Sequence, residues 1–326
     1  MSSTVPKLRI LSVIGEGSFG VVYQGYDHEN NLVAIKRTPK SSDCISREIS
    51  ILRSVRHPCI IHLKDIFYTY IDSDVGDSSK TRKVYQHLVM PYMPSSFHEL
   101  IYTQEFLPID VIMSVSWQLL LGVAHLEKLS ICHRDLKPQN ILYNAKNSRN
   151  EVKIADFGSA KILNSDQNVS YICSRPYRAP ELLLGRSDYT TKADVYSCGC
   201  IIAEAFLKRP LFQACSTMEQ VVTIMNALRP SRSTLEKVSG IQIRRGLEFD
   251  DCSFNDLLES IPQTPRDLIK KLISFDPEER PLASSAIRHP FFAPIWGRKA
   301  CSSIPLYFKD LEFDDYFRPT KWLCLN

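Results

Sequence analysis

The sequence predicts an α+β fold of two lobes, in which a small antiparallel sheet with one helix precedes a larger, mainly helical part. Residues 8–90 carry short apolar runs of strand type, whereas apolar residues recur at helical spacing from Pro94 onward. At 326 residues the chain has room for about two cores of ~150 residues. We expect one unit over residues 8–292, divided into 8–90, a connecting hinge at 91–94 and 95–292, with 293–326 as a C-terminal extension.

In the first part, three short strands are expected at residues 8–14, 21–23 and 32–36, separated by charged or Gly/Asn-rich turns. Ser41, Ser42 and Asp43 offer helix N-caps, and the apolar residues that follow them recur at helical spacing, which predicts one helix. The polar insertion at 72–83 is expected to be a mobile connection between strands.

In the second part, helical periodicity predicts helices in residues 111–126, 193–207, 218–228 and 268–275. We see no internal repeat and no long low-complexity segment. The connection between the two parts, residues 88–93, is apolar and contains Pro91.

Composition argues against a general nucleic-acid-binding, membrane or secreted protein. With 40 basic and 36 acidic side chains, a formal charge of +4 produces no field strong enough for general attraction to nucleic acid or membrane. Ten cysteines are scattered and form no Cys-x-x-Cys pair, so we expect reduced thiols. Residues 1–10 lack an apolar run of signal-peptide type, and polar residues interrupt 111–126. We expect a soluble cytoplasmic protein, with a nuclear share left open.

A glycine-rich loop lies between the first two expected strands, with Gly15, Gly17 and Gly20 in the spacing Gly-x-Gly-x-x-Gly. Backbone amides in such a loop can cover phosphates because no Cβ obstructs them. An ordinary glycine hairpin is one alternative, and a dinucleotide fold, in which the loop opens a helix, is another. The strand-to-strand context favours a loop that covers a nucleotide.

The most specific pattern is His133-Arg134-Asp135-x-Lys137-x-x-Asn140, followed by Asp156-Phe157-Gly158. Its five defined positions make chance occurrence on the order of one in ten thousand. The pattern resembles that of eukaryotic protein kinases, and the resemblance runs from about residue 8 to residue 292. It implies a nucleotide cleft between the two lobes.

The resemblance implies a role for each residue of the pattern. Asp135 would accept or orient the proton of the substrate hydroxyl, and Lys137 would neutralise charge on the transferred phosphoryl group. Asn140 and Asp156 would hold Mg²⁺, which prefers few protein ligands together with phosphate oxygens and water. Lys36 would hold the α- and β-phosphates of ATP, positioned by Glu48. The residues expected around ATP are Ile14, Gly15, Glu16, Gly17, Ser18, Phe19, Gly20, Val22, Ala34, Lys36, Met90, Pro91, Met93 and Leu142.

Two further expectations concern residues that stabilise the structure around these predicted catalytic residues. Glu181, in Ala179-Pro180-Glu181, is expected to form a buried ion pair with Arg280. Asp194 is expected to brace the catalytic loop.

Residues 156–161 and 169–181 closely resemble the shaggy-type glycogen synthase kinase 3 family. Cyclin-dependent and mitogen-activated kinases usually carry a phosphorylatable Thr in this loop, and here Val169 replaces it. The resemblance implies that Arg47, Arg134 and Lys161 bind a priming phosphate already on the substrate, and that Tyr171 is a regulatory phosphosite beside Arg175 and Arg178. A cyclin-dependent or mitogen-activated type of kinase stays open as an alternative, as does a non-catalytic scaffold.

Departures from that family limit what the resemblance implies. Pro176 replaces the expected aromatic residue, and residues 229–256 match the family's scaffold-binding region poorly, which leaves scaffold or regulatory partners open. Few residues precede the first expected strand, so we expect regulation without that family's N-terminal pseudosubstrate. The expected partners are protein substrates, pre-phosphorylated where priming applies, and the expected state is a monomer that binds neither nucleic acid nor membrane.

Overall fold

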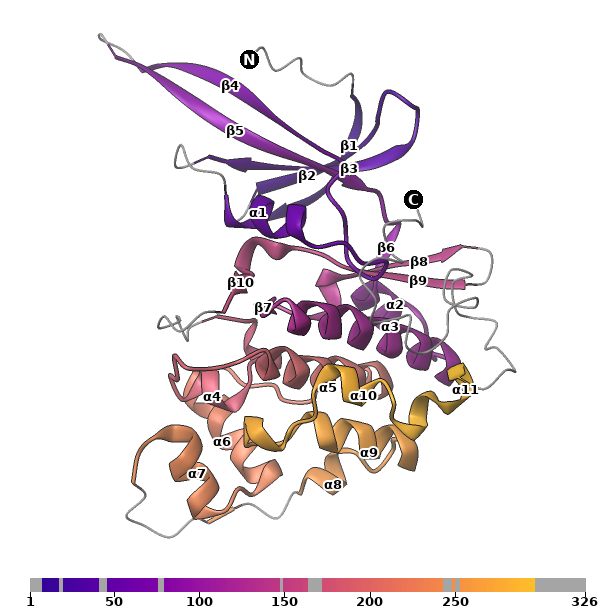
Figure 1. Cartoon of the computed structure of the whole chain (residues 1–326), viewed down its shortest axis with the longest axis vertical. Coiled ribbons are helices and arrows are strands. Elements are labelled where there is room, and N and C mark those ends of the chain that lie inside the picture. Colours follow the sequence, from indigo (N-terminus) through magenta and orange to yellow (C-terminus); the bar gives the residue numbers. More distant parts are fainter. Residues whose placement is uncertain are drawn as a thin grey trace. The chain divides into compact units, whose positions relative to one another are not determined.

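The computed structural model describes residues 8–17, 20–40, 46–75, 79–146, 149–163, 172–242, 248–249 and 253–296. The chain divides into two compact units, which Figure 1 shows in sequence colours. The N-terminal unit comprises Met1–Arg56 and Ile61–Pro94, and the C-terminal unit comprises His57–Ile60 and Ser95–Asn326.

The N-terminal unit is an antiparallel five-stranded sheet with the order β1-β2-β3-β5-β4 and one helix, α1 (Arg47–Ser54). Its core contains Val33, Ile35, Phe67 and Val89, because alternate residues of a strand point to the same face. This arrangement confirms the predicted sheet with one helix. The strands are β1 (Arg9–Gly17), β2 (Gly20–Tyr26), β3 (Leu32–Pro39), β4 (Asp65–Val75) and β5 (Ser79–Pro91).

The insertion at 72–83 is strand rather than the expected mobile connection. β4 and β5 continue to pair from Ile71 opposite Lys83 to Val75 opposite Ser79, leaving only 76–78 outside the described residues. The register continues without interruption, with Asp72 opposite Arg82 and Asp74 opposite Lys80. Polar composition alone predicted a loop, but the continued backbone pairing forms a long hairpin.

The C-terminal unit consists mainly of helices, as predicted. The helices nearest the catalytic loop are α2 (Phe97–Thr103), α3 (Ile109–Lys128) and α5 (Lys192–Leu207). The others are α4 (Pro180–Leu183), α6 (Thr217–Leu228), α7 (Arg232–Ser239), α8 (Phe254–Leu257), α9 (Gln263–Leu272), α10 (Ala283–Ala286) and α11 (Ala293–Trp296). The predicted helix at 268–275 is α9, which begins earlier and ends at Leu272.

Two small antiparallel sheets accompany these helices. One has the order β6-β8-β9 and the other pairs β10 with β7. Their strands are β6 (Ser95–Ser96), β7 (Ile131–Cys132), β8 (Ile141–Lys146), β9 (Arg149–Ile154) and β10 (Lys161–Ile162). Five short 3₁₀ turns lie in the described connections of this unit: η1 (Pro138–Asn140), η2 (Phe157–Ser159), η3 (Arg175–Tyr177), η4 (Pro277–Glu279) and η5 (Pro290–Phe292).

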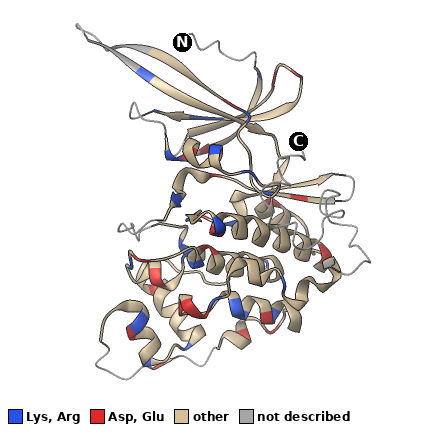
Figure 2. Cartoon of the chain, viewed as in Figure 1, with Lys and Arg blue, Asp and Glu red and all other residues tan. Residues whose placement is uncertain are grey.

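Helices α3 and α5 form the centre of the C-terminal core. Of the described helices, α3 alone is long and apolar enough to cross a membrane, but 78% of its apolar window is buried inside the fold, as in a core helix. Trp117 of α3 and Tyr196 of α5 are both fully buried. Cys198 and Cys200, also on α5, are buried free thiols. Figure 2 shows Lys and Arg interspersed with Asp and Glu along the described elements of both units.

Candidate active site

The catalytic loop follows β7, and Asp194 of α5 binds its backbone. The backbone N–H of His133 donates to Asp194 Oδ2 (2.6 Å), and that of Arg134 donates to Oδ1 (3.0 Å). Asp194 is 1% exposed, and burial raises the pKa of its carboxyl, while these two donors act in the opposite direction. With both oxygens bonded, Asp194 holds the loop backbone, including Arg134 at a left-handed φ of 67°.

Asp135 is the centre of a polar cluster. Its Oδ2 accepts a hydrogen bond from Lys137 Nζ (2.8 Å). Its Oδ1 accepts from both the backbone N–H (3.0 Å) and the hydroxyl (2.8 Å) of Ser174, and Lys137 Nζ also contacts Ser174 Oγ (3.2 Å). A carboxylate, an ammonium and a serine hydroxyl thus converge within hydrogen-bonding distance, although Ser174 lies 39 residues further along the chain.

Asn140 and Asp156 are the two predicted metal ligands, and a backbone hydrogen bond joins their segments. Asn140 Nδ2 donates to the Asp135 carbonyl (2.8 Å) and carboxylate (3.3 Å), which leaves the amide oxygen of Asn140 as its ligand atom. The Asn140 carbonyl accepts from Ala155 N–H (2.9 Å), directly before Asp156. Asp156 has a left-handed φ of 64°. One amide oxygen and one carboxylate are hard ligands, and this donor set fits Mg²⁺.

His133 connects the catalytic loop to the Asp156-Phe157-Gly158 turn. Its Nε2 lies 3.0 Å from the Ala155 carbonyl oxygen, and its ring meets Phe157 edge-on with centroids 4.8 Å apart. Phe157 is fully buried. His133 therefore holds the predicted metal-binding turn by packing and by a hydrogen bond.

In the N-terminal unit, Lys36 of β3 and Glu48 of α1 form an ion pair. Lys36 Nζ lies 2.7 Å from Glu48 Oε1, and both side chains are 11% exposed. Ser46 caps α1 by accepting from Ile49 N–H, and Ile49, Ile51 and Leu52 bury one helix face. The packing of α1 thereby directs Glu48 toward β3.

The other residues predicted around ATP fall in both units. Val22 is opposite Lys36 in the strand register, and Ala34 is opposite Met90. A Cβ on Gly17 would meet no described atom within 4 Å. Leu142, of β8, belongs to the C-terminal unit. The remaining N-terminal residues are Ile14, Gly15 and Glu16 on β1, Gly20 at the start of β2, Pro91 at the end of β5 and Met93 just beyond it, while Ser18 and Phe19 lie outside the described residues.

The three cations predicted to bind a priming phosphate also belong to different units. Arg47 begins α1 in the N-terminal unit and is exposed. Arg134 and Lys161 belong to the C-terminal unit, where Lys161 of β10 is opposite Cys132 in the β7 register. Arg134 Nε donates to the Ser159 carbonyl (2.6 Å) and its Nη1 to the Tyr189 hydroxyl (3.0 Å). The local structure thus orients Arg134 beside the strand that carries Lys161.

Tyr171, the predicted phosphosite, lies outside the described residues, as does Val169. The two arginines expected to receive its phosphate bind backbone carbonyls. Arg175 Nη1 donates to Ala214 O (3.2 Å) and Cys215 O (2.7 Å), and Arg178 Nη2 donates to Cys173 O (2.6 Å). These bonds hold the segment that carries Ser174.

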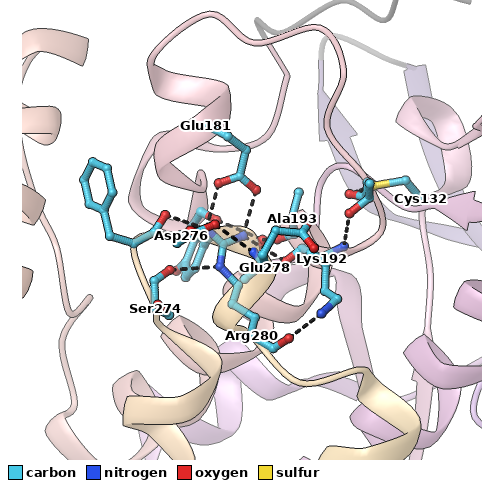
Figure 3. A network of polar contacts seen from close by, with 12 residues as sticks. Cys132, Glu181, Lys192, Ala193, Ser274, Asp276, Glu278 and Arg280 are labelled. Atoms are coloured by element: carbon cyan, nitrogen blue, oxygen red, sulfur yellow. Dashed lines mark hydrogen bonds and ion pairs between the residues drawn. The ribbon is translucent and has the colours of Figure 1, made fainter. Parts of the chain in front are cut away.

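Figure 3 shows the ion pair that anchors the end of this segment. Arg280 donates from Nη1 and Nη2 to the two carboxylate oxygens of Glu181, each at 2.7 Å. Lys192 Nζ donates to the Arg280 carbonyl, and the Tyr196 ring lies 5.0 Å from the guanidinium carbon. Arg280 is 1% exposed, so the pair is buried and bidentate, in agreement with the expectation from sequence.

Ser174 is the one residue of the catalytic cluster that sequence reasoning missed. The available signal was its position, a hydroxyl residue that directly precedes Arg175-Pro176-Tyr177 and the Ala179-Pro180-Glu181 motif. Tyr189 and Ser159, which orient Arg134, carried no comparable signal.

Comparison with known proteins places this site in a family. A model of the protein kinase domain matches residues 8–292. The chain is 38% identical to the probable serine/threonine-protein kinase glkA of Dictyostelium discoideum over 290 residues, which are 88% of this chain and 59% of that protein. It is 38% identical to protein kinase gsk3 of Schizosaccharomyces pombe over 291 residues, 86% of this chain and 72% of the relative. Identity to glycogen synthase kinase 3 of Trypanosoma brucei brucei is 35% over 312 residues, 92% and 86% of the two chains.

The chain therefore belongs to the protein kinase family. Kinases of this family transfer phosphate from ATP to proteins. Within the family, it is a glycogen synthase kinase 3-like Ser/Thr protein kinase.

Proposed function

We propose that this kinase transfers the γ-phosphate of Mg-ATP to Ser or Thr of protein substrates and prefers substrates primed by a phosphate C-terminal to the target residue. The observation that carries the catalytic part is the cluster of Asp135, Lys137 and Ser174, together with the Lys36–Glu48 ion pair. Their carboxylate and ammonium groups are those that phosphoryl transfer needs for positioning and for charge stabilisation.

Each residue has a stated task in this proposal. Asp135 accepts the proton of the substrate hydroxyl, and its two oxygens are already oriented by Lys137 and Ser174. Lys137 neutralises charge that develops on the transferred group. Lys36 holds the α- and β-phosphates, and Glu48 keeps its ammonium in place. Asn140 and Asp156 would hold Mg²⁺, which supplies charge neutralisation at the phosphates when bound.

The priming preference rests on three cations. Val169 has no hydroxyl and cannot be phosphorylated. Arg134 and Lys161 therefore cannot bind a phosphate of the enzyme's own at position 169. β7 and β10 pair directly, which keeps these two cations on neighbouring segments. Arg47 adjoins Glu48 on α1. A dianionic phosphate that binds all three would engage the helix, the catalytic loop and the activation segment at once.

The priming proposal is tested with one peptide in two forms, with and without a phosphoserine four residues after the target. We expect wild-type enzyme to favour the primed peptide by at least ~10-fold in kcat/KM, because each charge-assisted contact is worth ~1.5–3 kcal/mol before screening. Arg47→Ala should erase much of that preference and spare the unprimed peptide.

Arg53→Ala is the matched control, since it removes the same charge from the exposed last turn of the same helix. Equal kcat/KM for both peptides with wild-type enzyme would refute the priming preference. Asp135→Asn tests catalysis separately: it should abolish phosphate incorporation into either peptide, and incorporation at the wild-type rate would refute the assignment of the base.

A further inference from the structure

A polar cavity in the C-terminal unit lies outside the catalytic cluster. It is formed between the C-terminal ends of α6 and α9 and the N-terminal ends of α7 and α8, which are labelled in Figure 1. Its volume of about 530 Å³ falls in the ~300–1,000 Å³ range of small-molecule sites. No described residue that is predicted to bind ATP, Mg²⁺ or a priming phosphate belongs to its lining.

Three cations and one acid line this cavity: Arg229, Lys270, Lys271 and Glu279. Arginine and lysine side chains only donate hydrogen bonds, whereas a carboxylate only accepts them. Glu279 already accepts from the Ser274 hydroxyl (2.5 Å). The charged lining therefore offers mainly donors, which fits a negatively charged ligand with several acceptor oxygens.

The three cations differ in the partners that they already have. Lys271 Nζ is ion-paired with Asp267 Oδ2 at 2.7 Å. Hydrogen bonds in the α8 capping box lower the pKa of Asp256, and the Arg229 charge contributes to the same shift. Lys270 is exposed and has no hydrogen bond or ion pair with any described residue. A ligand in the cavity can therefore pair with Lys270 without breaking an existing ion pair.

The connection between α6 and α7 brings further donors to the same cavity. Arg229 is the C-cap of α6, at a left-handed φ of 48° that favours glycine, and its N–H donates to the Met225 carbonyl (2.8 Å). An arginine at this position adds a guanidinium to the lining, where glycine would add no side chain. Ser231 and Thr234, at the start of α7, also line the cavity, and their hydroxyl oxygens lie 2.9 Å apart. Either hydroxyl can rotate to donate to a ligand oxygen.

We propose that this cavity binds a phosphate group. A dianionic phosphate offers three strong acceptor oxygens, which arginine, lysine and hydroxyl groups bind through charge-assisted hydrogen bonds. A carboxylate has a single charge and two oxygens, so it would leave more of these donors without a partner. The cavity is larger than a phosphate ion, so it also has room for a phosphorylated residue of a bound protein. This site is separate from the proposed priming site and does not depend on it.

Fluorescence anisotropy with a labelled alanine peptide that carries one phosphoserine tests the proposal. The full chain carries Arg47→Ala, which removes one predicted contact of the priming site. We expect this protein to bind the phosphopeptide at least ~10-fold more tightly than its unphosphorylated twin, because the twin makes no charge-assisted contacts. Addition of Lys270→Ala should weaken phosphopeptide binding by ~10-fold or more. Equal affinity for the two peptides would overturn the proposal.

Lys83→Ala is the matched control. Lys83 is also exposed, but it lies on β5 of the other unit and has no hydrogen bond or ion pair with any described residue. The control should leave the affinity for the phosphopeptide unchanged. Equal losses for Lys270→Ala and Lys83→Ala would reveal a general charge effect and would contradict the proposed site. So would the disappearance of all phosphate-dependent binding between wild type and Arg47→Ala, since the priming site would then account for it.

Competition at constant ionic strength distinguishes the two sources of the phosphate. Inorganic phosphate should displace the phosphopeptide from the cavity in either case. Displacement at concentrations near the Kd of the peptide would assign the site to the free ion. Displacement only at much higher concentrations would assign it to a phosphorylated protein, because the residues around the phosphoserine then add affinity. A peptide with glutamate in place of phosphoserine that binds equally tightly would refute the choice of phosphate.

Discussion

At the scale of single residues, hydrogen bonds from neighbouring side chains orient both carboxylate oxygens of Asp135. Lys137 and Asn140 contact one carboxylate oxygen, and Ser174 contacts the other through two hydrogen bonds. Groups that are already in place at the moment of reaction need no reorganisation, which lowers the barrier to the chemical step. Position, as much as charge, therefore decides the contribution of each side chain.

The substitution Lys36→Arg tests the importance of side-chain position for a residue predicted to hold the phosphates of ATP. The guanidinium keeps the charge but not the geometry of the Lys36–Glu48 pair, whose atoms lie 2.7 Å apart. We expect nucleotide affinity to change little and kcat to fall by ~10²-fold, because a displacement of ~1 Å can cost that much. Steady-state kinetics and nucleotide titration measure the two effects separately.

Lys64→Arg is the control for that experiment. Lys64 is ion-paired with Asp27 at 2.9 Å in the same unit, but neither residue is among those predicted to contact ATP. Its turnover should match the wild type, and near-wild-type turnover of Lys36→Arg would refute the role of Lys36.

At the scale of elements, helix contacts depend on where glycine allows close approach. Gly199 of α5 faces the end of α9, where an added Cβ would lie 2.5 Å from Ile273 Cγ1 and 2.9 Å from Leu272 Cβ. Both are inner atoms of buried side chains, so the backbone of one element would have to shift. Gly122 of α3 differs, because its nearest neighbour at 2.6 Å is the terminal Cδ1 of Ile154.

We therefore predict that Gly199→Ala lowers the free energy of unfolding by roughly 1–3 kcal/mol because of overpacking. This loss is larger than the ~0.5–1 kcal/mol by which alanine in place of glycine stabilises a helix. Gly122→Ala should lower it less, since the Ile154 side chain can rotate. Chemical unfolding followed by circular dichroism measures both. A stabilised Gly199→Ala variant would contradict the predicted overlap.

At the scale of the whole molecule, long-range pairs join segments that are distant in the chain. Glu181 and Arg280 are 99 residues apart and form a bidentate pair in the C-terminal core. The loss of one partner would leave a buried charge, which typically costs about 3–5 kcal/mol. The anchored end of the activation segment and the C-terminal helices are thus coupled in stability.

The pH dependence of stability also belongs to this scale. The rings of His57 and His125 stack with centroids 5.0 Å apart. Burial lowers the pKa of His125 to about 4 and that of His57 well below its usual value. In the unfolded chain both return to about 6.5, so below that pH the unfolded state binds more protons than the folded state. Stability should therefore decrease as the pH falls from about 6.5 to about 4.

Equilibrium unfolding at pH 7 and pH 5 measures this decrease. His125→Phe keeps an aromatic ring and removes one titrating group, so we expect a shallower loss of stability between the two pH values. His28→Gln is the control, because the His28 side chain is 70% exposed. The same pH dependence in His125→Phe and wild type would rule out His125 as a contributor.

The sequence by itself determined the class of fold and the family, and it predicted the residues at the centre of the candidate site. Motifs such as His133-Arg134-Asp135 and Asp156-Phe157-Gly158 consist of consecutive residues. They can therefore be identified in the sequence without a structure. Helical periodicity likewise placed α3, α5 and α6, because a buried face repeats every turn. The ion pair of Glu181 with Arg280 was predictable only through resemblance.

The tertiary structure alone decided which distant groups complete the site. Ser174 reaches Asp135 across 39 residues, and Arg134 reaches Tyr189 across 55. No local pattern encodes such contacts, because they depend on how the catalytic loop, the activation segment and the segment before α5 pack together. The β4–β5 hairpin shows the same limit, since its composition suggests a loop until the cross-strand register is known. Local interactions determine which elements form, and packing determines which side chains meet.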